Sequence, residues 1–373
     1  MSEFFQKLDL EAVMTRVDIE NFNEKLPDPL NRKDVIFTLY GRNALFLGAE
    51  AIAEQTYKKV ILMPSYSFGD EIVAVKTAGF EPEFYDVDPD SLQVQIKSIE
   101  VELDPSRIGC MLLTHYFGFP QRQVKEIQNL CLSRGIYLIE DCAHALGSSI
   151  DNQYVGTFGD IAVFSIRKFF PIPHGGALVV NNKKLKVSDL TSPNSTAVSQ
   201  DVFLMLGYRN GIFKPGQPID SILGGFGKQV DRHGPRLAEH GGYRLAMSNF
   251  AKNAIKLCAE GSSLKTRALY FQNYLELVCR YKSDTFSPVF DNLPEGVIPL
   301  FFPLTVDDSE EVNKKLLGMG FDITQPFWSY LHHFIDWEKH LGAKNLKGRI
   351  LVLPVSHAIN QAKLEQLFAA IGR

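Results

Sequence analysis

The stretch IYLIEDCAHALG, residues 136–147, decides the fold. Its apolar start predicts a buried strand, and that strand ends in the carboxyl groups of Glu140 and Asp141. A carboxylate at the end of a buried strand is costly unless it meets a cation. Asp141 and His144 stand three residues apart, so both face one pocket if a helical turn starts there. Asp141 therefore either caps a helix or is a counter-ion that keeps a cofactor nitrogen protonated, with His144 touching the same ring.

The alternation of strand and helix patterns extends outward from this stretch over residues 34–181. Strands separated by helices predict a mostly parallel sheet with helices on both faces. The apolar runs lie at 35–39, 60–63, 82–87, 110–114, 136–141, 161–166 and 177–181, with helical patterns at 43–54, 68–77 and 124–133. The later patterns are helices at 247–264, 265–281, 309–318 and 361–371 and strands at 298–306 and 350–354. We expect an α/β fold with an N-terminal arm (1–30), a large domain (31–245) and a smaller α+β domain (246–373).

Composition and charge narrow the class of protein. The 373 residues include 39 Lys and Arg against 43 Asp and Glu, and 45% are hydrophobic. A disordered or fibrous chain is excluded, and the net charge of −4 disfavours binding to nucleic acid or an anionic membrane. The five cysteines form no CxxC pair and predict small buried residues in a reducing, cytoplasmic compartment. The adjacent His332 and His333 lack flanking ligands, so we expect no metal site.

A lysine marks the end of another predicted strand. Lys168 follows the run at 161–166, and Ser165 offers a hydroxyl group for an anion on the same segment. A lysine at a strand end is usually solvated. In a partly apolar pocket, however, its pKa falls and it can form a Schiff base.

Two earlier strand ends carry a glycine turn and an aromatic residue. Gly41, Arg42 and Asn43 open a helix after the run at 35–39, and such a helix N-terminus suits a phosphate. A plain helix start is the commoner explanation of this pattern. Phe68 follows the run at 60–63 and either stacks on a planar cofactor or packs in the core. The order of these strand ends along the chain is the one expected of a pyridoxal-phosphate pocket.

Several motifs together resemble one known family. They are MPSYSF at 63–68, AGF at 78–80, YDVD at 85–88, HYFG at 115–118, IEDCAHALG at 139–147, VGTFGD at 155–160, FSIRK at 164–168 and GGA at 175–177. The chain resembles the fold-type I aminotransferases of the DegT/DnrJ/StrS group, which act on nucleotide-linked keto sugars. The resemblance is strong over residues 34–181 and loose in the C-terminal part.

The resemblance implies a role for each matching residue. Lys168 looks like the lysine that forms a Schiff base with pyridoxal phosphate and shuttles the proton. Asp141 is similar to the aspartate that keeps the pyridinium nitrogen charged, so that the ring is an electron sink. His144 matches a residue that contacts the ring, Phe68 resembles the stacking aromatic, and Ser165 resembles a phosphate-binding serine.

The chain departs from the family pattern around the cofactor phosphate. Gly41, Arg42 and Asn43 occupy what looks like the phosphate-binding turn, but Arg42 stands where Thr is usual. Ser165 precedes the lysine by three residues, where five are commoner. The usual Asn-Tyr-Arg-Met-Ser becomes RLAMS at 244–248, which removes a contact that the family makes from the partner subunit. We hypothesise that Arg244 or Arg42 supplies a phosphate contact instead.

These observations predict an aminotransferase that moves an amino group, from glutamate, to a nucleotide-linked keto sugar. The family implies a homodimer and a place in polysaccharide biosynthesis. One alternative is a pyridoxal-dependent sugar dehydratase of the same family, but those members have His where this chain has Lys168. The other alternative is a non-catalytic pyridoxal-phosphate-binding or regulatory protein, which the shortened loop and altered phosphate contacts favour.

Overall fold

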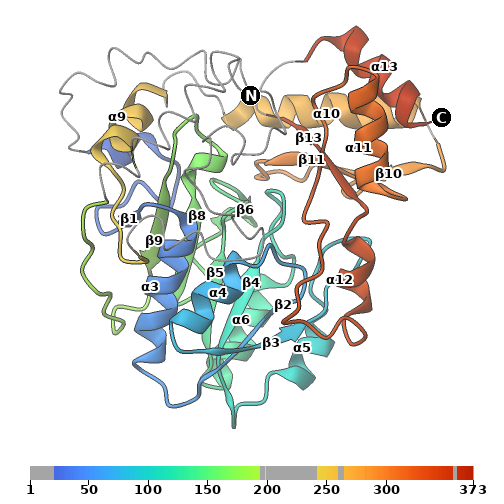
Figure 1. Ribbon diagram of the computed structural model, residues 1–373. Helices are drawn as coiled ribbons and strands as arrows, with labels where there is room; N and C mark the ends of the chain where they lie inside the picture. The colour runs from blue at the N-terminus through green and yellow to red at the C-terminus, as the bar shows by residue number, and fades with distance from the viewer. Residues whose placement is uncertain are drawn as a thin grey trace, which may run out of the picture.

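A seven-stranded sheet organises the first half of the chain (Figure 1). The computed structural model describes residues 21–193, 198, 242–258, 264–281, 283–355 and 359–372. The strands, in spatial order, are β1 (Ile36–Thr38), β9 (Gly176–Val180), β8 (Ile161–Ser165), β5 (Tyr137–Asp141), β4 (Ile108–Thr114), β2 (Val60–Pro64) and β3 (Glu81–Tyr85). All pairs between β8 and β3 are parallel, whereas β9 is antiparallel to both neighbours. Only residues 166–175 separate β8 from β9, which is too short for a parallel crossover.

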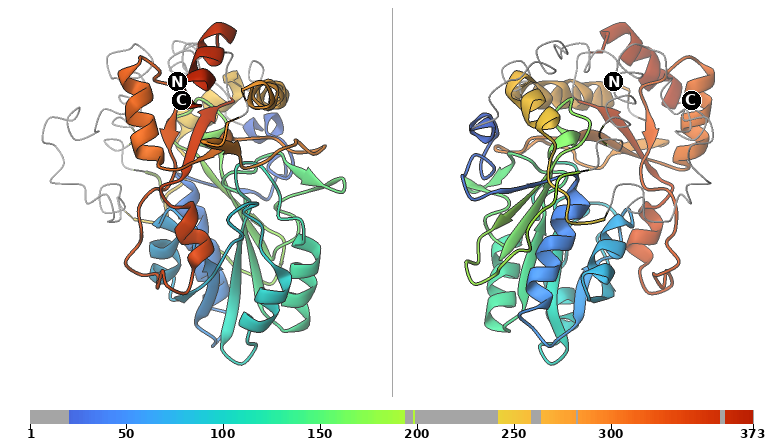
Figure 2. Two further views of the ribbon diagram at one scale, coloured as in Figure 1. Left: turned by 90° about the vertical axis from the view of Figure 1, so that its right-hand side faces the viewer. Right: turned by 60° about the vertical axis from the view of Figure 1, so that its left-hand side comes forward.

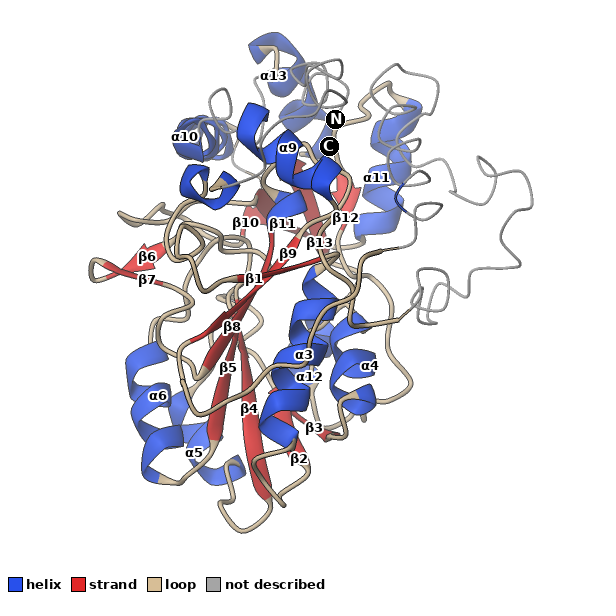
Figure 3. Ribbon diagram, turned by 90° about the vertical axis from the view of Figure 1, so that its left-hand side faces the viewer, coloured by secondary structure: helices blue, strands red, loops and turns tan. Residues whose placement is uncertain are grey.

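Helices cover both faces of this sheet, as the sequence predicts. Figure 3 shows α3 (Gly41–Ala53) and α4 (Asp70–Thr77) on one face, with α5 (Ile96–Glu102) and α6 (Val124–Ser133) on the other. Because the sheet is covered twice, every residue of the central strand β4 is buried. The short 3-10 helices η1 (Phe22–Lys25) and η2 (Ile166–Lys168) and the hairpin β6 (Ser149–Ile150) and β7 (Gln153–Tyr154) lie in the connections.

The C-terminal part builds a second, antiparallel sheet. Its order is β10 (Phe286–Pro288), β11 (Phe301–Val306), β13 (Ile350–Pro354) and β12 (Gln325–Pro326). Its helices are α10 (Leu264–Arg280), α11 (Ser309–Gly318), α12 (Leu341–Leu346) and α13 (Gln361–Ile371), while α9 (Asn249–Cys258) precedes them (Figure 2). One hydrophobic cluster is continuous from the α5 and α6 face into this second sheet. The rings of Phe119 and Phe290 stack across the junction at 3.7 Å.

Residues near the expected domain boundary remain tied to the large sheet. The Leu39 N–H donates to the Leu245 carbonyl at 2.9 Å, and the Met247 N–H donates to the Phe37 carbonyl at 3.1 Å. Side chains of α9 also pack in a cluster with Phe22 from the expected N-terminal arm, whose residues 1–20 lie outside the described chain. The division at 245 and 246 stays a prediction.

The expectation that the cysteines are buried holds for three of the four described cysteines. Cys110, Cys131 and Cys142 are buried as expected, but Cys279 is exposed, because it lies on the outer face of the amphipathic helix α10. The side chain of Cys258 lies outside the described part of the structure. Within the described residues, no helix has the length and apolar character needed to cross a bilayer.

Helix α12 connects the C-terminal part to the edge of the large sheet (Figure 1). The Asp86 carboxylate, directly after β3, accepts hydrogen bonds from the backbone N–H groups of Gly342 and Ala343, both at 2.7 Å. These are unpaired N–H groups of the first helical turn, which a carboxylate satisfies well. The segment from β12 to β13 is thereby held against the carboxyl ends of β2 and β3.

Candidate active site

The predicted phosphate turn and the predicted serine meet where α3 begins. Helix α3 starts at Gly41, as expected, directly after the edge strand β1. A Cβ atom on Gly41 would lie 3.2 Å from the Phe164 carbonyl oxygen and 3.4 Å from the Ser165 Cβ. A Cβ on Gly176 would lie 2.5 Å from the Gly41 nitrogen. The first N–H groups of α3, at Gly41 and Arg42, and the buried Ser165 hydroxyl therefore lie close together at the sheet edge.

Lys168 and Asp141 lie at the neighbouring ends of β8 and β5. Lys168 closes η2 and is partly exposed, and its ammonium group makes no hydrogen bond or ion pair within the described residues. Burial lowers the pKa of Lys168 to about 8, although the Asp141 and Glu71 carboxylates act in the opposite direction. Burial raises the pKa of Asp141, against the effects of the Ala143 N–H and of Lys168. The charges on these two side chains therefore affect each other's pKa.

Asp141 is not a helix cap. Residues 142–147 form turns, and the Asp141 Oδ1 accepts a hydrogen bond from the Ala143 N–H at 3.0 Å. The helical turn that the sequence allowed is absent from these described residues, yet Asp141 and His144 are both buried near Lys168. The counter-ion interpretation is thus the one that fits the local structure.

His144 is a neutral ring with a free nitrogen. Its side chain is 3% exposed, and its Nδ1 has no hydrogen-bond partner among the described residues. Burial, with a smaller effect of Lys168, holds the pKa of His144 well below its usual value. The rings of Trp328, Phe327 and Phe117 surround it at 5.2, 5.7 and 5.8 Å. A buried polar nitrogen without a partner marks a place where a ligand group is expected.

Arg42 and Asn43 face different neighbours. The Arg42 guanidinium donates to the Asp70 carboxylate at 2.7 Å, and its buried Nε has no partner within the described chain. The Asn43 side chain donates to the carbonyl oxygen of Tyr243 at 2.8 Å and so holds the segment at 242–243. Arg42 consequently keeps a spare donor near the start of α3, whereas Asn43 has a structural contact.

Arg244 lies away from the predicted phosphate turn of its own chain. Its guanidinium pairs with Glu50 at 2.5 Å, and Glu50 is nine residues beyond Gly41 on α3, about 13 Å along the helix axis. The structure therefore brings Arg42 to the start of α3 but not Arg244.

Phe68 is partly exposed and lies beside aromatic residues of the C-terminal part. Its side chain is 40% exposed, and its ring lies 6.1 Å from Tyr330 and 6.3 Å from Trp328. Trp328 adopts φ 50°, which is unusual for a bulky residue and often marks a functional site. An aromatic wall from the C-terminal part thus faces the predicted cofactor residues.

Two ionisable groups in this region were not predicted. Glu71, on the first turn of α4, accepts a hydrogen bond from the Gly69 N–H at 2.9 Å, and burial raises its pKa to about 7. Lys347 donates to the Ser67 carbonyl at 2.7 Å, and burial lowers its pKa to about 7. An acid in a first helical turn is common, and an isolated lysine gives no sequence signal. Neither residue could therefore be selected from the sequence.

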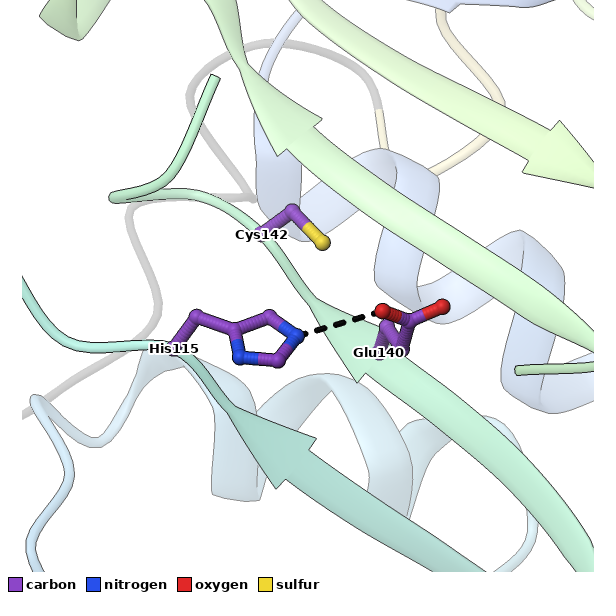
Figure 4. Close-up of side chains that lie close together, drawn as sticks. All are labelled: His115, Glu140 and Cys142. Carbon is purple, nitrogen blue, oxygen red and sulfur yellow. Dashed lines mark hydrogen bonds and ion pairs between the residues drawn. The ribbon is translucent and has the colours of Figure 1, made fainter. Parts of the chain in front are cut away.

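Three side chains that are able to bind a metal lie close together, those of His115, Glu140 and Cys142 (Figure 4). The Glu140 carboxylate already accepts bonds from three backbone N–H groups, those of Gly156 (2.8 Å), Phe158 (2.7 Å) and Gly159 (2.6 Å). The His115 Nδ1 accepts from the Gln121 N–H at 2.9 Å, so its Nε2 carries the proton and donates to Glu140 at 3.1 Å. Burial raises the pKa of Cys142 well above the usual range. We interpret the cluster as a structural clamp.

The profile of the DegT/DnrJ/EryC1/StrS aminotransferase family matches residues 5–195, just over half of the chain. The chain belongs to this family. GDP-perosamine synthase of Escherichia coli O157:H7 is 31% identical over 169 residues, covering 45% of this chain and 46% of the relative. The dTDP-4-dehydro-2,3,6-trideoxy-D-glucose 4-aminotransferase of Saccharopolyspora spinosa is 36% identical over 133 residues, covering 36% and 34%. These matches span less than half the length of the curated relatives.

The fold is shared over almost the whole chain with a solved structure. That structure is GDP-4-keto-6-deoxymannose-3-dehydratase with a trapped PLP-glutamate geminal diamine. The TM-score is 0.66 at 16% identity, over 98% of this chain and 97% of that chain. The similarity confirms the predicted α/β fold with a large, mostly parallel sheet and a smaller C-terminal sheet.

We predict that the neutral form of Lys168 appears at unusually low pH. Acetic anhydride labelling of the protein, read by peptide mass spectrometry, should give a labelling midpoint at pH about 8 for Lys168. Because the Asp141 carboxylate raises this pKa, Asp141→Asn should move the midpoint lower. A lysine amide in the same mixture corrects for reagent decay. A midpoint near the ordinary lysine value of 10.5 would contradict the described burial.

We also predict that Glu140 stabilises the fold without a metal. Glu140→Gln replaces one accepting oxygen by a donor facing N–H groups and should lower the free energy of unfolding by about 2–4 kcal/mol. Glu126→Gln, on the exposed side of α6, is the control and should change stability little. Guanidinium denaturation with and without zinc measures both. Stabilisation of the wild-type protein by zinc would show that the clamp interpretation is wrong.

Proposed function

We propose that this chain is a pyridoxal-phosphate-dependent aminotransferase that transfers an amino group from glutamate to a nucleotide-linked keto sugar. The observation that carries the proposal is the Lys168 ammonium group, unpaired among the described residues, near the buried Asp141 carboxylate and the His144 ring at the carboxyl ends of β8 and β5. In open α/β sheets, ligands bind at this edge. Three groups of the right chemistry at the right edge make a much stronger case than any one of them.

The residues present fit pyridoxal phosphate. Among the buried polar atoms that lack partners within the described residues are the His144 Nδ1, near Lys168, and the Arg42 Nε and Asn43 Oδ1, on the first turn of α3. Lys168 would hold the cofactor covalently, Asp141 its ring nitrogen and His144 its ring face. The free N–H groups at the start of α3, the Ser165 hydroxyl and Arg42 would hold its phosphate. When bound, this cofactor supplies an electron sink for the substrate carbon.

The chain's own groups perform the proton transfers. With a pKa of about 8, the Lys168 Nζ is partly neutral near pH 7.5, so it can accept a proton and return it without a large energy penalty. The Ala143 N–H and Lys168 favour the ionised form of Asp141 against the effect of burial, so Asp141 would supply a negative charge to the cofactor nitrogen. His144 stays neutral and adds no competing positive charge.

The names of the relatives support the substrate class. One is a dTDP-linked keto-sugar aminotransferase, and the solved dehydratase was trapped with PLP and glutamate. Lys168 favours the aminotransferase over the dehydratase alternative, since a lysine can both bond to the cofactor and shuttle the proton. The homodimer, the cytoplasmic location and the role in polysaccharide biosynthesis stay predictions.

Mixing the purified protein with pyridoxal phosphate should produce an imine absorbance band, which glutamate then removes. Lys168→Ala should give no band, because its side chain is the one that bonds to the cofactor. Lys125→Ala, which removes a surface lysine paired with Asp151, should behave like the wild-type protein. A screen of nucleotide-linked keto sugars with glutamate then identifies the acceptor.

The outcomes separate the alternatives. A band that survives in Lys168→Ala would overturn the assignment of the lysine. No band in the wild-type protein would favour a non-catalytic protein that does not bind the cofactor. A band without any reaction of the sugar would favour a non-catalytic pyridoxal-phosphate-binding protein, and dehydration of the keto sugar in place of amino transfer would favour the dehydratase.

A further inference from the structure

Two basic side chains of the C-terminal part hold consecutive backbone carbonyl groups of the β2–α4 turn, residues 65–69. The Lys347 Nζ donates to the Ser67 carbonyl at 2.7 Å, and the His332 Nε2 donates to the Phe68 carbonyl at 2.8 Å. Both side chains are buried, with 8% and 4% exposure. Contacts between residues more than 260 positions apart thus fix this turn from one side.

The ammonium group of Lys347 is buried among aromatic rings. Its ammonium lies 5.2–5.9 Å from four aromatic rings, those of Tyr66, Tyr330, Trp328 and Trp337. Within the described residues it has no carboxylate at ion-pair distance. A buried cation is costly unless its donors and its surroundings compensate it. The Ser67 carbonyl and the aromatic faces offset part of this cost, so the hydrogen bond to Ser67 helps to keep the lysine and the turn in place.

His332 approaches the turn so closely that only glycine fits at position 69. A Cβ atom on Gly69 would lie 1.7 Å from the His332 Nε2, and Gly69 adopts φ 112°. The turn therefore has a side-chain-free residue where the C-terminal part contacts it. Its geometry depends on that contact as well as on β2.

The residue that follows the turn contacts the arginine at the start of α3. Asp70, the residue after Gly69, binds the Arg42 guanidinium at 2.7 Å, with the two side chains 34% and 13% exposed. Arg42 lies on the first turn of α3, next to Gly41. A continuous set of contacts thus runs from Lys347 and His332 through the turn and Asp70 to Arg42.

We propose that Lys347 and His332 are positioning residues that set the Arg42 guanidinium for the cofactor phosphate by fixing the β2–α4 turn. This inference rests on the proposed function only for the identity of the ligand. It assigns to the C-terminal part a role in cofactor binding that involves no direct contact with the cofactor. The affinity for the phosphate should therefore depend on residues far from it in the sequence.

Comparing two ligands tests the inference. The full-length Lys347→Met variant is titrated with pyridoxal 5′-phosphate and with pyridoxal, which lacks the phosphate, and the imine absorbance is followed. We expect the Kd for pyridoxal phosphate to rise about tenfold, while the Kd for pyridoxal changes less than about twofold. The reason is that the variant weakens one charge-assisted contact to the phosphate, which pyridoxal lacks. Asp70→Asn should give the same pattern, and combining both changes should add little, because they act through one path.

The controls keep the inference open to refutation. Lys344→Met removes a lysine of α12, three residues before Lys347, that pairs with Glu338 at the surface, and this change should alter neither Kd. Lys347→Arg, which keeps a donor and a cation, should restore most of the difference between the ligands. If Lys347→Met does not fold, His332→Gln and Asp70→Asn provide the same comparison. An equal loss for both ligands, or no loss for either, would overturn the inference. If the wild-type protein binds neither ligand, the proposed function fails first.

Discussion

The central constraint of this molecule is the ammonium group of a largely buried lysine, which has no hydrogen-bonded partner among the described residues. Lys168 stays there because the Asp141 and Glu71 carboxylates partly offset the cost of burial. The mostly parallel sheet makes this possible, since it brings the ends of β5 and β8 to one edge. Aromatic residues of the C-terminal part then pack against that edge, with the Trp328 ring 5.2 Å from the His144 ring.

Two neighbouring residues on β5 have different roles: one stabilises the fold and the other belongs to the candidate active site. Glu140 and Asp141 are adjacent, and successive strand residues point to opposite faces of a sheet. Glu140 therefore meets three backbone N–H groups and His115 on one side, where its charge is fully used by the fold. Asp141 points to the other side, toward Lys168, where its charge remains available to a ligand. The rigid clamp on Glu140 thus also fixes the direction of Asp141.

Much of the site was predictable because its signals are local. Strand ends, a helix start at Gly41 and the spacing of Asp141, His144 and Lys168 can be recognised in short windows, and the structure brings these residues together. Of the two alternatives that the sequence left open for Asp141, the helix cap does not fit, because the chain turns there without forming a helix. Lys347 was not predictable, since its meaning lies in tertiary contacts to a turn 280 positions away. The pairing of Arg244 with Glu50 depends likewise on how distant segments pack.

The most direct test of the account is to find which lysine bonds to the cofactor. The protein is incubated with pyridoxal phosphate, reduced with borohydride, digested and mapped by mass spectrometry. The account predicts a phosphopyridoxyl group on Lys168, with every other peptide unmodified at equimolar cofactor. Modification of another lysine, such as the buried Lys347, or the absence of any stable adduct would contradict it.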